Sequence, residues 1–432
     1  MERLSNELLQ EILDCIGVDA ESTVSIDRRA YLSVESFAAP SAPAPAQAQD
    51  LASFRLVCRR FARLGLSHQF TRVTTRFSRR GFARLEGIAG SAHLARQVKK
   101  FSYMVPCFYV QGRERITELF QQFQADQFQG DLSCLDAAHF IRKAQDQREI
   151  VESACDLQAL KSAISAFTSL QHVQILRLQD EPDRLLWEYI REHHDSASEY
   201  VELKWMPACV HGTRTICEAL LEAQSPFTRF SGPMMNPQSV LILQDNPVEK
   251  VSSLASRLTC LELHFDEGFD LDRRMRQLSP LLRTVFHAAT GMLAVHIGFP
   301  SRTPLALALE DIFHDVRWER LRAFGIQAWR LDAEEIIALA RRHRRTLRGL
   351  RLRDILLKGS SRWKTVLGML RDEMEQLDWV SLRRIGYART FDEHFAGTME
   401  VPPDPPGGGS DSDIEDGFST HLANDDQDDH DN

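Results

Sequence analysis

The feature that most constrains this chain is one apolar spacing, apolar-x-x-apolar-x-apolar, which recurs from about residue 98 onward. Short apolar segments of this kind are typical of buried β-strands, and helix-like stretches separate them. The last five segments begin at residues 258, 292, 321, 347 and 377, so their starts lie 26 to 34 residues apart. Such a period predicts a repeat architecture. The seven segments begin at Val98, Val173, Leu258, Met292, Leu321, Leu347 and Leu377.

One strand and one helix per unit is the construction of a leucine-rich-repeat solenoid. Apolar residues at helical spacing predict helices near 305–316 and 363–374, and Asp332 with Glu335 predicts a capping box at the start of a third helix. No unit has the Asn or Cys that usually stands two residues after the third apolar position, so we expect irregular turns. We therefore predict a mixed α/β fold with an irregular leucine-rich-repeat-like solenoid over residues 67–400. The alternative is an ordinary α/β domain whose buried strands share the spacing.

Two amphipathic helices are predicted ahead of the repeats, within a helical module at residues 1–66. Apolar residues from Leu8 to Ile16 recur on one helical face, and Ser5 or Asn6 is placed to cap the first turn. The same periodicity resumes from Leu51 to Phe61. Between the two helices, residues 17–50 form an Ala/Pro-rich insertion, in which successive prolines disfavour helix.

The C-terminal end is strongly acidic. Residues 410–432 contain nine Asp or Glu and no Lys or Arg, and a Pro/Gly-rich linker precedes them. Because so few large apolar residues follow the linker, we expect residues 401–432 to be a disordered acidic tail. The whole chain has 52 Lys or Arg and 61 Asp or Glu, so the part before the tail is formally neutral. A neutral body has no bulk electrostatic attraction for phosphate, and we expect neither nucleic acid nor a membrane as partner.

The eight cysteines are scattered, and none belongs to a C-x-x-C pair. In a chain long enough to fold without disulfides they are typical of a reducing compartment. No apolar run approaches the roughly 18 residues of a membrane span. The charged N-terminus does not fit a secretory signal. We expect a soluble cytoplasmic or nuclear protein.

The common enzyme motifs are absent from the sequence. It contains no G-x-x-x-x-G-K-[ST], G-x-G-x-x-G, H-E-x-x-H or G-x-S-x-G. Cys209, His211 and Cys217 are near neighbours, and His193 and His194 lie beside acidic residues, but neither spacing fits a known metal-ligand frame. We expect no catalytic residue, no metal and no cofactor; a hydrolase or transferase of unrecognised type is the alternative.

The N-terminal segment resembles an F-box. The stretch L-S-N-E-L-L-Q-E-I-L at residues 4–13 is similar to the family's opening pattern, L-P-x-E-[LI]-[LIV]-x-x-I-[LF]. The stretch L-A-S-F-R-L-V-C-R-R-F at residues 51–61 is similar to its closing pattern, L-x-x-[FLA]-R-x-V-C-[RK]-x-[FW]. Ser5 stands where the family has Pro, and about thirty residues separate halves that a short turn normally joins. The alternative is a pair of amphipathic helices in a larger helical domain.

In F-box proteins the box binds the Skp adaptor, which links it to the cullin of an SCF ubiquitin ligase. The resemblance, which is to F-box proteins of filamentous-fungal type, implies a non-catalytic subunit that recruits a target for ubiquitination. The implied adaptor-binding residues are Leu4, Glu7, Leu8, Ile12, Leu13, Leu51, Leu56, Val57, Cys58 and Phe61. The alternative function is a leucine-rich-repeat scaffold that binds proteins without engaging a ligase.

An unknown protein target is expected on the strand-lined face of the solenoid. Strand residues alternate between faces, so the residues that flank the second and third apolar positions should point outward. The last two units place three Arg beside a Trp, a composition suited to an acidic or phosphorylated segment. The predicted target-binding residues are Arg351, Arg353, Trp379 and Arg383, and the same rule places Arg177, Gln179, Glu262, His264, His296 and Gln327 on this face.

The densest basic run is Arg341 to Arg345, continued to Arg353. At the C-terminal turn of a helix such residues complement the helix dipole, which is the interpretation we favour. A nuclear-import signal, an RNA contact and a site for an acidic partner are the functional alternatives.

Overall fold

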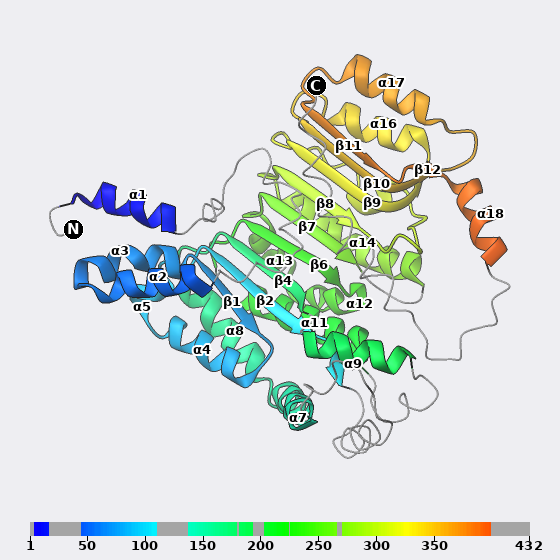
Figure 1. Cartoon of the computed structure of the whole chain (residues 1–432). Helices are drawn as coiled ribbons and strands as arrows, with labels where there is room; N and C mark the ends of the chain where they lie inside the picture. The colour runs from blue at the N-terminus through cyan, green and yellow to red at the C-terminus, as the bar shows by residue number, and fades with distance from the viewer. Residues whose placement is uncertain are drawn as a thin grey trace. The chain divides into compact units, whose positions relative to one another are not determined.

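The computed structural model describes residues 4–16, 45–109, 137–178, 181–192, 203–223, 225–265 and 270–398 (Figure 1). The described chain divides into two compact units, with the boundary between Phe227 and Thr228. Both units are mixed α/β, and the paired strands of their main sheets are parallel, which confirms the predicted fold class at that level. Most of the predicted insertion and all of the predicted acidic tail lie outside the described residues.

Unit 1 contains three parallel strands, and β2 (Lys100–Pro106) pairs with β1 (Arg72–Arg76) on one side and β4 (His172–Leu178) on the other. A small antiparallel pair joins β3 (Phe108–Tyr109) to β5 (Leu203–Lys204). The helices of unit 1 are α1 (Asn6–Ile16), α2 (Pro45–Leu56), α3 (Arg59–Phe70), α4 (Arg79–Ala89), α5 (Ala92–Ala95), α7 (Ala137–Ser153), α8 (Cys155–Ala166), α9 (Glu181–Glu192) and α11 (Trp205–Glu222).

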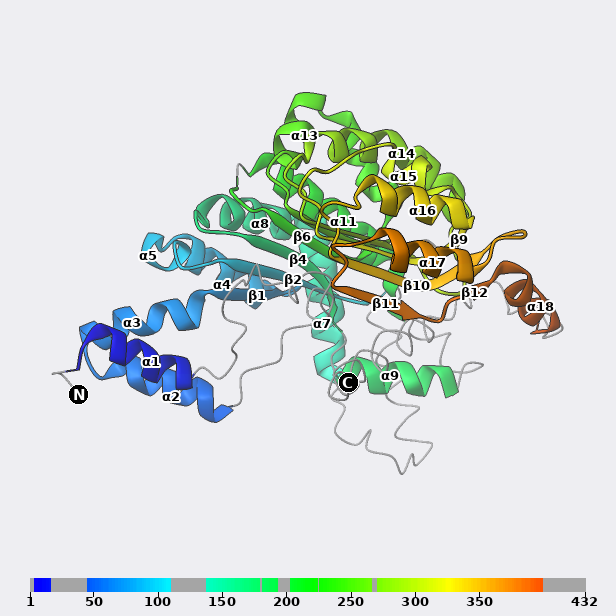
Figure 2. The ribbon, with the colours of Figure 1, turned by 90° about the horizontal axis from the view of Figure 1, so that it is seen from above.

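Helices α8 and α11 cover one face of the unit 1 strands (Figure 2). Phe101 of β2 contacts Phe167 at the end of α8, with ring centroids 6.0 Å apart. Gly212 of α11 approaches the sheet so closely that a Cβ there would lie 3.1 Å from Val105 and 3.2 Å from Ile175. The apolar side chains on this face of β2 and β4 therefore form the core of the unit.

Unit 2 contains strands that pair in the order of the chain, all of them parallel. They are β6 (Arg229–Met235), β7 (Cys260–Phe265), β8 (Ala294–Gly298), β9 (Ala323–Leu331), β10 (Gly349–Leu357) and β11 (Trp379–Arg383), with β12 (Gly386–Tyr387) also pairing with β10. The helices are α12 (Pro237–Val240), the 3-10 helix η4 (Leu241–Asp245), α13 (Val248–Ala255), α14 (Leu271–Ala288), α15 (Leu309–Phe313), α16 (Ala333–Arg342), α17 (Trp363–Glu373) and α18 (Ala388–Thr398).

The recurring apolar positions of unit 2 lie side by side in the sheet. One row across neighbouring strands consists of Leu261, Val295, Phe324, Leu350 and Val380. This row faces the helices, since the Phe324 ring lies 5.0 Å from that of Phe313 on α15. All seven segments predicted as strands are strands, which confirms the reading of the spacing.

Two helix predictions are confirmed and one is wrong in length. The segment near 363–374 forms α17, and Asp332 and Glu335 form the predicted capping box of α16, with the Asp332 N–H donating to Glu335 Oε1 at 2.9 Å. The segment near 305–316 forms only the five-residue α15. Its first residue, Leu305, instead pairs its backbone with Ala328 and Arg330 in an extended bridge beside β9, so hydrogen bonding to the sheet replaces the first helical turn.

The second predicted N-terminal helix is two helices rather than one. The chain breaks between α2 and α3, where Cys58 is extended with φ −162°. The apolar periodicity continues across the break because Phe54 and Phe61 enter the same core, their rings stacked 4.5 Å apart. Residues 45–50, predicted as part of the insertion, belong to α2, whose first residue is Pro45; proline is tolerated there because the first-turn N–H has no partner within a helix.

Candidate functional site

The helices α1, α2 and α3 form a small module with a closed core. Leu9 and Leu13 of α1 pack with Phe54 of α2 and Phe61 of α3, and all four are buried. Arg60 of α3 fastens the start of α1, because it donates to the Leu4 carbonyl at 2.6 Å and to Asn6 Oδ1 at 2.8 Å. We refer to α1–α3 as the N-terminal module.

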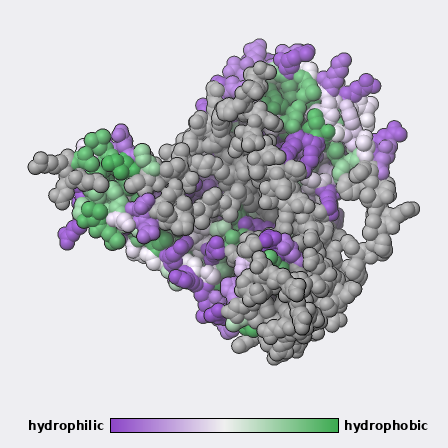
Figure 3. Space-filling model, in the orientation of Figure 1, coloured by the Kyte–Doolittle hydropathy of each residue, from purple (hydrophilic) through white to green (hydrophobic). Residues whose placement is uncertain are grey.

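Three large apolar side chains of this module remain in solvent. Leu8 of α1 is 48% exposed, Leu56 at the end of α2 is 86% exposed, and Val57 in the break before α3 is 63% exposed. Figure 3 shows hydrophobic residues at the surface of this module. Exposed apolar side chains gathered on one small element are typical of a surface that binds a partner.

The ten predicted adaptor-binding residues divide by burial. Exposed residues are Glu7, Leu8, Leu56 and Val57; half-buried residues are Leu4, Ile12, Leu51 and Cys58; buried residues are Leu13 and Phe61. Leu13 and Phe61 therefore hold the module together instead of presenting contact surface. The sequence pattern could not separate the two groups, since both recur at helical spacing. Backbone N–H groups and Ser5 lower the pKa of Glu7, and Arg60 lowers it further, so Glu7 carries a negative charge on this surface.

A second group of functional candidates lies on the face of the unit 2 sheet opposite the apolar row. Glu262 of β7 is fully buried and accepts from Arg229 Nη2 at 2.9 Å and from Ser231 Oγ at 2.8 Å. Arg229 and Ser231 come from β6, which the sequence analysis missed because this strand lacks the apolar spacing. Charge-assisted hydrogen bonds are stronger than neutral ones, so this group ties β6 to β7.

His264 and His296 continue this polar face. Their Nε2 atoms lie 2.8 Å apart and their rings stack at 5.0 Å. Burial lowers the pKa of His264 to about 3, with further lowering from Arg353 and Arg351; burial also lowers that of His296 well below 6.5. Both rings are therefore neutral near pH 7, and one Nε2 donates to the other.

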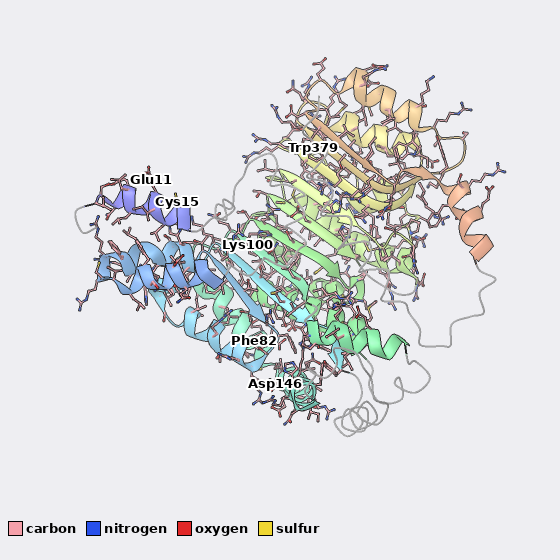
Figure 4. All side chains as sticks on the ribbon, viewed as in Figure 1. Glu11, Cys15, Phe82, Lys100, Asp146 and Trp379 are labelled. Atoms are coloured by element: carbon pink, nitrogen blue, oxygen red, sulfur yellow. The ribbon has the colours of Figure 1, made fainter. Side chains whose placement is uncertain are left out.

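Trp379 is the first residue of β11 (Figure 4). It packs against the buried cluster of Cys260, Leu293, Ala294 and Ala323, and its indole covers Gly349, where a Cβ would collide with the ring. The indole is therefore half-buried and does not stand free in solvent beside the Arg residues. The small residues beneath it leave room that the indole fills.

The outward orientation predicted for unit 2 is confirmed, but the predicted exposure is wrong for several residues. Glu262, His264 and His296 are buried, and Arg353 is only 9% exposed. Arg351 and Arg383 are half-buried. Hydrogen bonds and neighbouring charges compensate the buried groups, which strand alternation alone cannot predict.

In unit 1 the predicted orientation is reversed at β4. Arg177 pairs in register with Val105, and Val105 lies beneath α11 on the helix-covered face. Apolar residues occur on both faces of β4, so the apolar spacing identified the wrong face of this strand as the helix-covered one. Gln179 lies outside the described residues.

The basic run joins neighbouring helices at the end of α16. Arg341 holds Glu373 of α17 through two hydrogen bonds of 2.7 and 2.6 Å, and Arg342 pairs with Glu310 of α15. Both Arg residues lie in the last turn of α16, where they also complement the helix dipole.

Within the described residues, no group of three or more His, Cys, Asp or Glu is arranged to hold a metal ion. His211 instead bonds to the buried Asp156 at 2.7 Å, and Cys209 and Cys217 are buried. In the same described part, no helix has both the length and the apolarity to cross a membrane. Comparison with protein-family models and with curated proteins finds no match for this chain.

Proposed function

We propose that this chain is a non-catalytic F-box subunit that recruits targets to a cullin-based (SCF) ubiquitin ligase. The observation that carries the proposal is the N-terminal module, whose core is closed while Leu8, Leu56 and Val57 stay exposed. Leu56 ends α2 and Val57 lies in the α2–α3 break, so both belong to a connection held by helices on both sides. Such preorganised apolar side chains bind a partner at little entropic cost.

We further propose that unit 2 is an irregular leucine-rich-repeat-like solenoid that binds the target. The support is its chain-order parallel sheet, in which the equivalent apolar residues of successive units lie in register. Within it, Arg351 and Arg383 are half-buried cations of the predicted target site. Trp379 is half-buried on the same face, and Arg353 is buried near His264.

Adaptor binding tests the first proposal. Leu56→Asp with Val57→Asp should weaken binding to the Skp adaptor at least a hundredfold, because burying each apolar side chain contributes about 1.5–3 kcal/mol. Val248→Asp is the matched control, since Val248 of α13 is 61% exposed but lies in unit 2. A calorimetric titration measures both. Absence of binding by the unsubstituted chain at micromolar concentration would contradict the ligase proposal.

Target recovery tests the second proposal. Arg351→Ala with Arg383→Ala should remove the target from an affinity purification while the adaptor is still recovered. Arg341→Ala is the control, because Arg341 lies in the last turn of α16 and not on the strand face. Unchanged target recovery from the double variant would place the target elsewhere.

The alternative, a repeat scaffold outside any ligase, shares the target-binding surface of unit 2. It predicts target recovery without adaptor, so the same purification separates the two functions.

A further inference from the structure

Unit 1 has an arginine where its core should be apolar. Arg177 stands near the carboxyl end of β4, in register with Val105 of β2. Val105 and Ile175 contact α11 at Gly212, so this face of the strands lies beneath the helix. Arg177 is half-buried on this face.

Its contacts leave donors unused. The Arg177 Cζ lies 4.9 Å from the ring centroid of Trp205, the first residue of α11, and Nη2 lies 3.7 Å from Cys107 Sγ. The Nε and Nη1 atoms of Arg177 are buried and have no acceptor among the described residues. Trp205 is only 3% exposed, and its Nε1–H also has no acceptor there.

These unused donors are energetically unusual. A guanidinium that stacks on an indole uses its flat face, so the N–H groups at its edge still need acceptors. Arginine stays protonated in proteins, so its charge persists when it is taken out of water. The Cys107 sulfur atom is only a weak hydrogen-bond acceptor. A buried charge without a partner is strongly destabilising, and buried donors in folded proteins almost always have acceptors. The arrangement is complementary to a negatively charged oxygen group.

Asp183, the acidic group of the hydrogen-bond network that includes Cys107, does not supply that oxygen. Asp183 of α9 accepts from the Tyr109 hydroxyl at 2.8 Å and from Lys143 Nζ at 2.5 Å. The Gln147 side-chain amide donates to the Cys107 carbonyl and accepts from the Tyr109 backbone N–H. This network therefore supplies no acceptor to Arg177 Nε or Nη1.

The position in the fold favours an anion as well. Trp205 begins an 18-residue helix whose N-cap residue, Lys204, makes no side-chain cap, and the N-terminus of a long helix carries partial positive charge. The site also lies at the carboxyl ends of parallel strands, where α/β sheets commonly bind ligands.

We propose that Arg177 and Trp205 form a binding site for a compact oxyanion, a phosphate or carboxylate group, inside unit 1. This site is independent of the proposed adaptor and target surfaces. It makes unit 1 a ligand-binding element.

The indole N–H resonance of Trp205, assigned in the full-length chain with a Trp205→Phe variant, reports on the site. Sodium phosphate and sodium acetate are titrated separately, each against sodium chloride at equal ionic strength. We expect a saturable shift of this resonance with at least one of the two anions and none with chloride. A shift with phosphate alone identifies a phosphoryl ligand, and one with acetate alone identifies a carboxylate. Absence of a saturable shift with both anions would overturn the proposal.

Substitutions test the role of the guanidinium. Arg177→Gln should weaken the bound anion at least tenfold, and Arg177→Lys should weaken it by less because it keeps the charge but loses the planar fork. Arg214→Gln is the matched control, since Arg214 is exposed on the same helix as Trp205 and pairs with Glu218. A shift that survives in Arg177→Gln would contradict the assignment. If Arg177→Gln does not fold, the titration of the unsubstituted chain still decides the proposal.

Discussion

At the scale of single residues, unit 2 repeats one backbone conformation that its sequence does not predict. Ala328, Asp354 and Arg384 all have left-handed backbone, with φ values of 56°, 53° and 48°. Each directly follows a residue of one register row, Gln327, Arg353 and Arg383. Non-glycine residues in this region cost about 1–2 kcal/mol each, so three aligned instances mark a bend that the repeat requires.

Asp354 stabilises that bend with its side chain. It accepts from Ser301 Oγ at 3.0 Å and from Arg384 Nε at 2.5 Å. We predict that Asp354→Ala lowers the free energy of unfolding by about 2–4 kcal/mol, because both the bonds and the tolerance of Asp for left-handed backbone are lost. Asp354→Asn keeps that tolerance and should lose about 1–2 kcal/mol. Urea unfolding measures both; equal losses would show that the backbone conformation contributes nothing.

At the level of residues, the sequence predicts which face of a strand a side chain occupies, but it does not predict how buried that side chain is. Strand alternation placed Glu262 and His264 on the correct face, but their burial depends on Arg229, Ser231 and His296 from other strands. Those partners become neighbours only through the register of the sheet, which a linear pattern does not contain.

At the scale of elements, strands were easier to predict than helix ends. The strands β7–β11 have a local apolar signature, whereas the break between α2 and α3 leaves the helical periodicity undisturbed. The site of the N-terminal module was predicted as a set of ten residues, but only packing divides them into core and surface. The Arg177 site had no sequence signal, because an Arg within an apolar strand segment is read as its solvent-facing residue.

Two glycines in neighbouring elements should respond oppositely to alanine. At Gly349 of β10 a Cβ would collide with the Trp379 indole, so we predict that Gly349→Ala lowers the unfolding free energy by about 1–3 kcal/mol. Gly368 lies inside α17 with open space around it, so Gly368→Ala should raise stability by about 0.5–1 kcal/mol. Thermal unfolding measures both. Stability unchanged by Gly349→Ala would mean that Trp379 does not pack where the structure puts it.

At the scale of the whole molecule, unit 2 has a built-in sensitivity to acid. Burial lowers the pKa of His264 to about 3 and that of His343 to about 4, so both are neutral when folded. The unfolded chain binds these protons near pH 6.5. The contribution of the two histidines to the free energy of unfolding is therefore fully present above that pH and is lost as the pH falls toward 4.

The contribution of His343 to this acid sensitivity can be measured separately. His343 Nε2 accepts from the backbone N–H of Trp318 at 3.2 Å, a bond that Gln could replace. We predict that His343→Gln lowers the slope of the unfolding free energy against pH by roughly 1.4 kcal/mol per pH unit between pH 6 and 4.5. Urea unfolding at several pH values measures it, and the comparison cancels the contribution of the carboxylates. Identical slopes for the two proteins would refute it.

The central claim, that one chain joins a ligase adaptor to a target, is tested most directly by affinity purification of the full-length chain from its own cells. We predict that the Skp adaptor and a cullin are recovered in near-stoichiometric amounts, that Leu56→Asp with Val57→Asp removes both while the target remains, and that Val248→Asp changes neither. Recovery of targets without adaptor or cullin from the unsubstituted chain would contradict the claim.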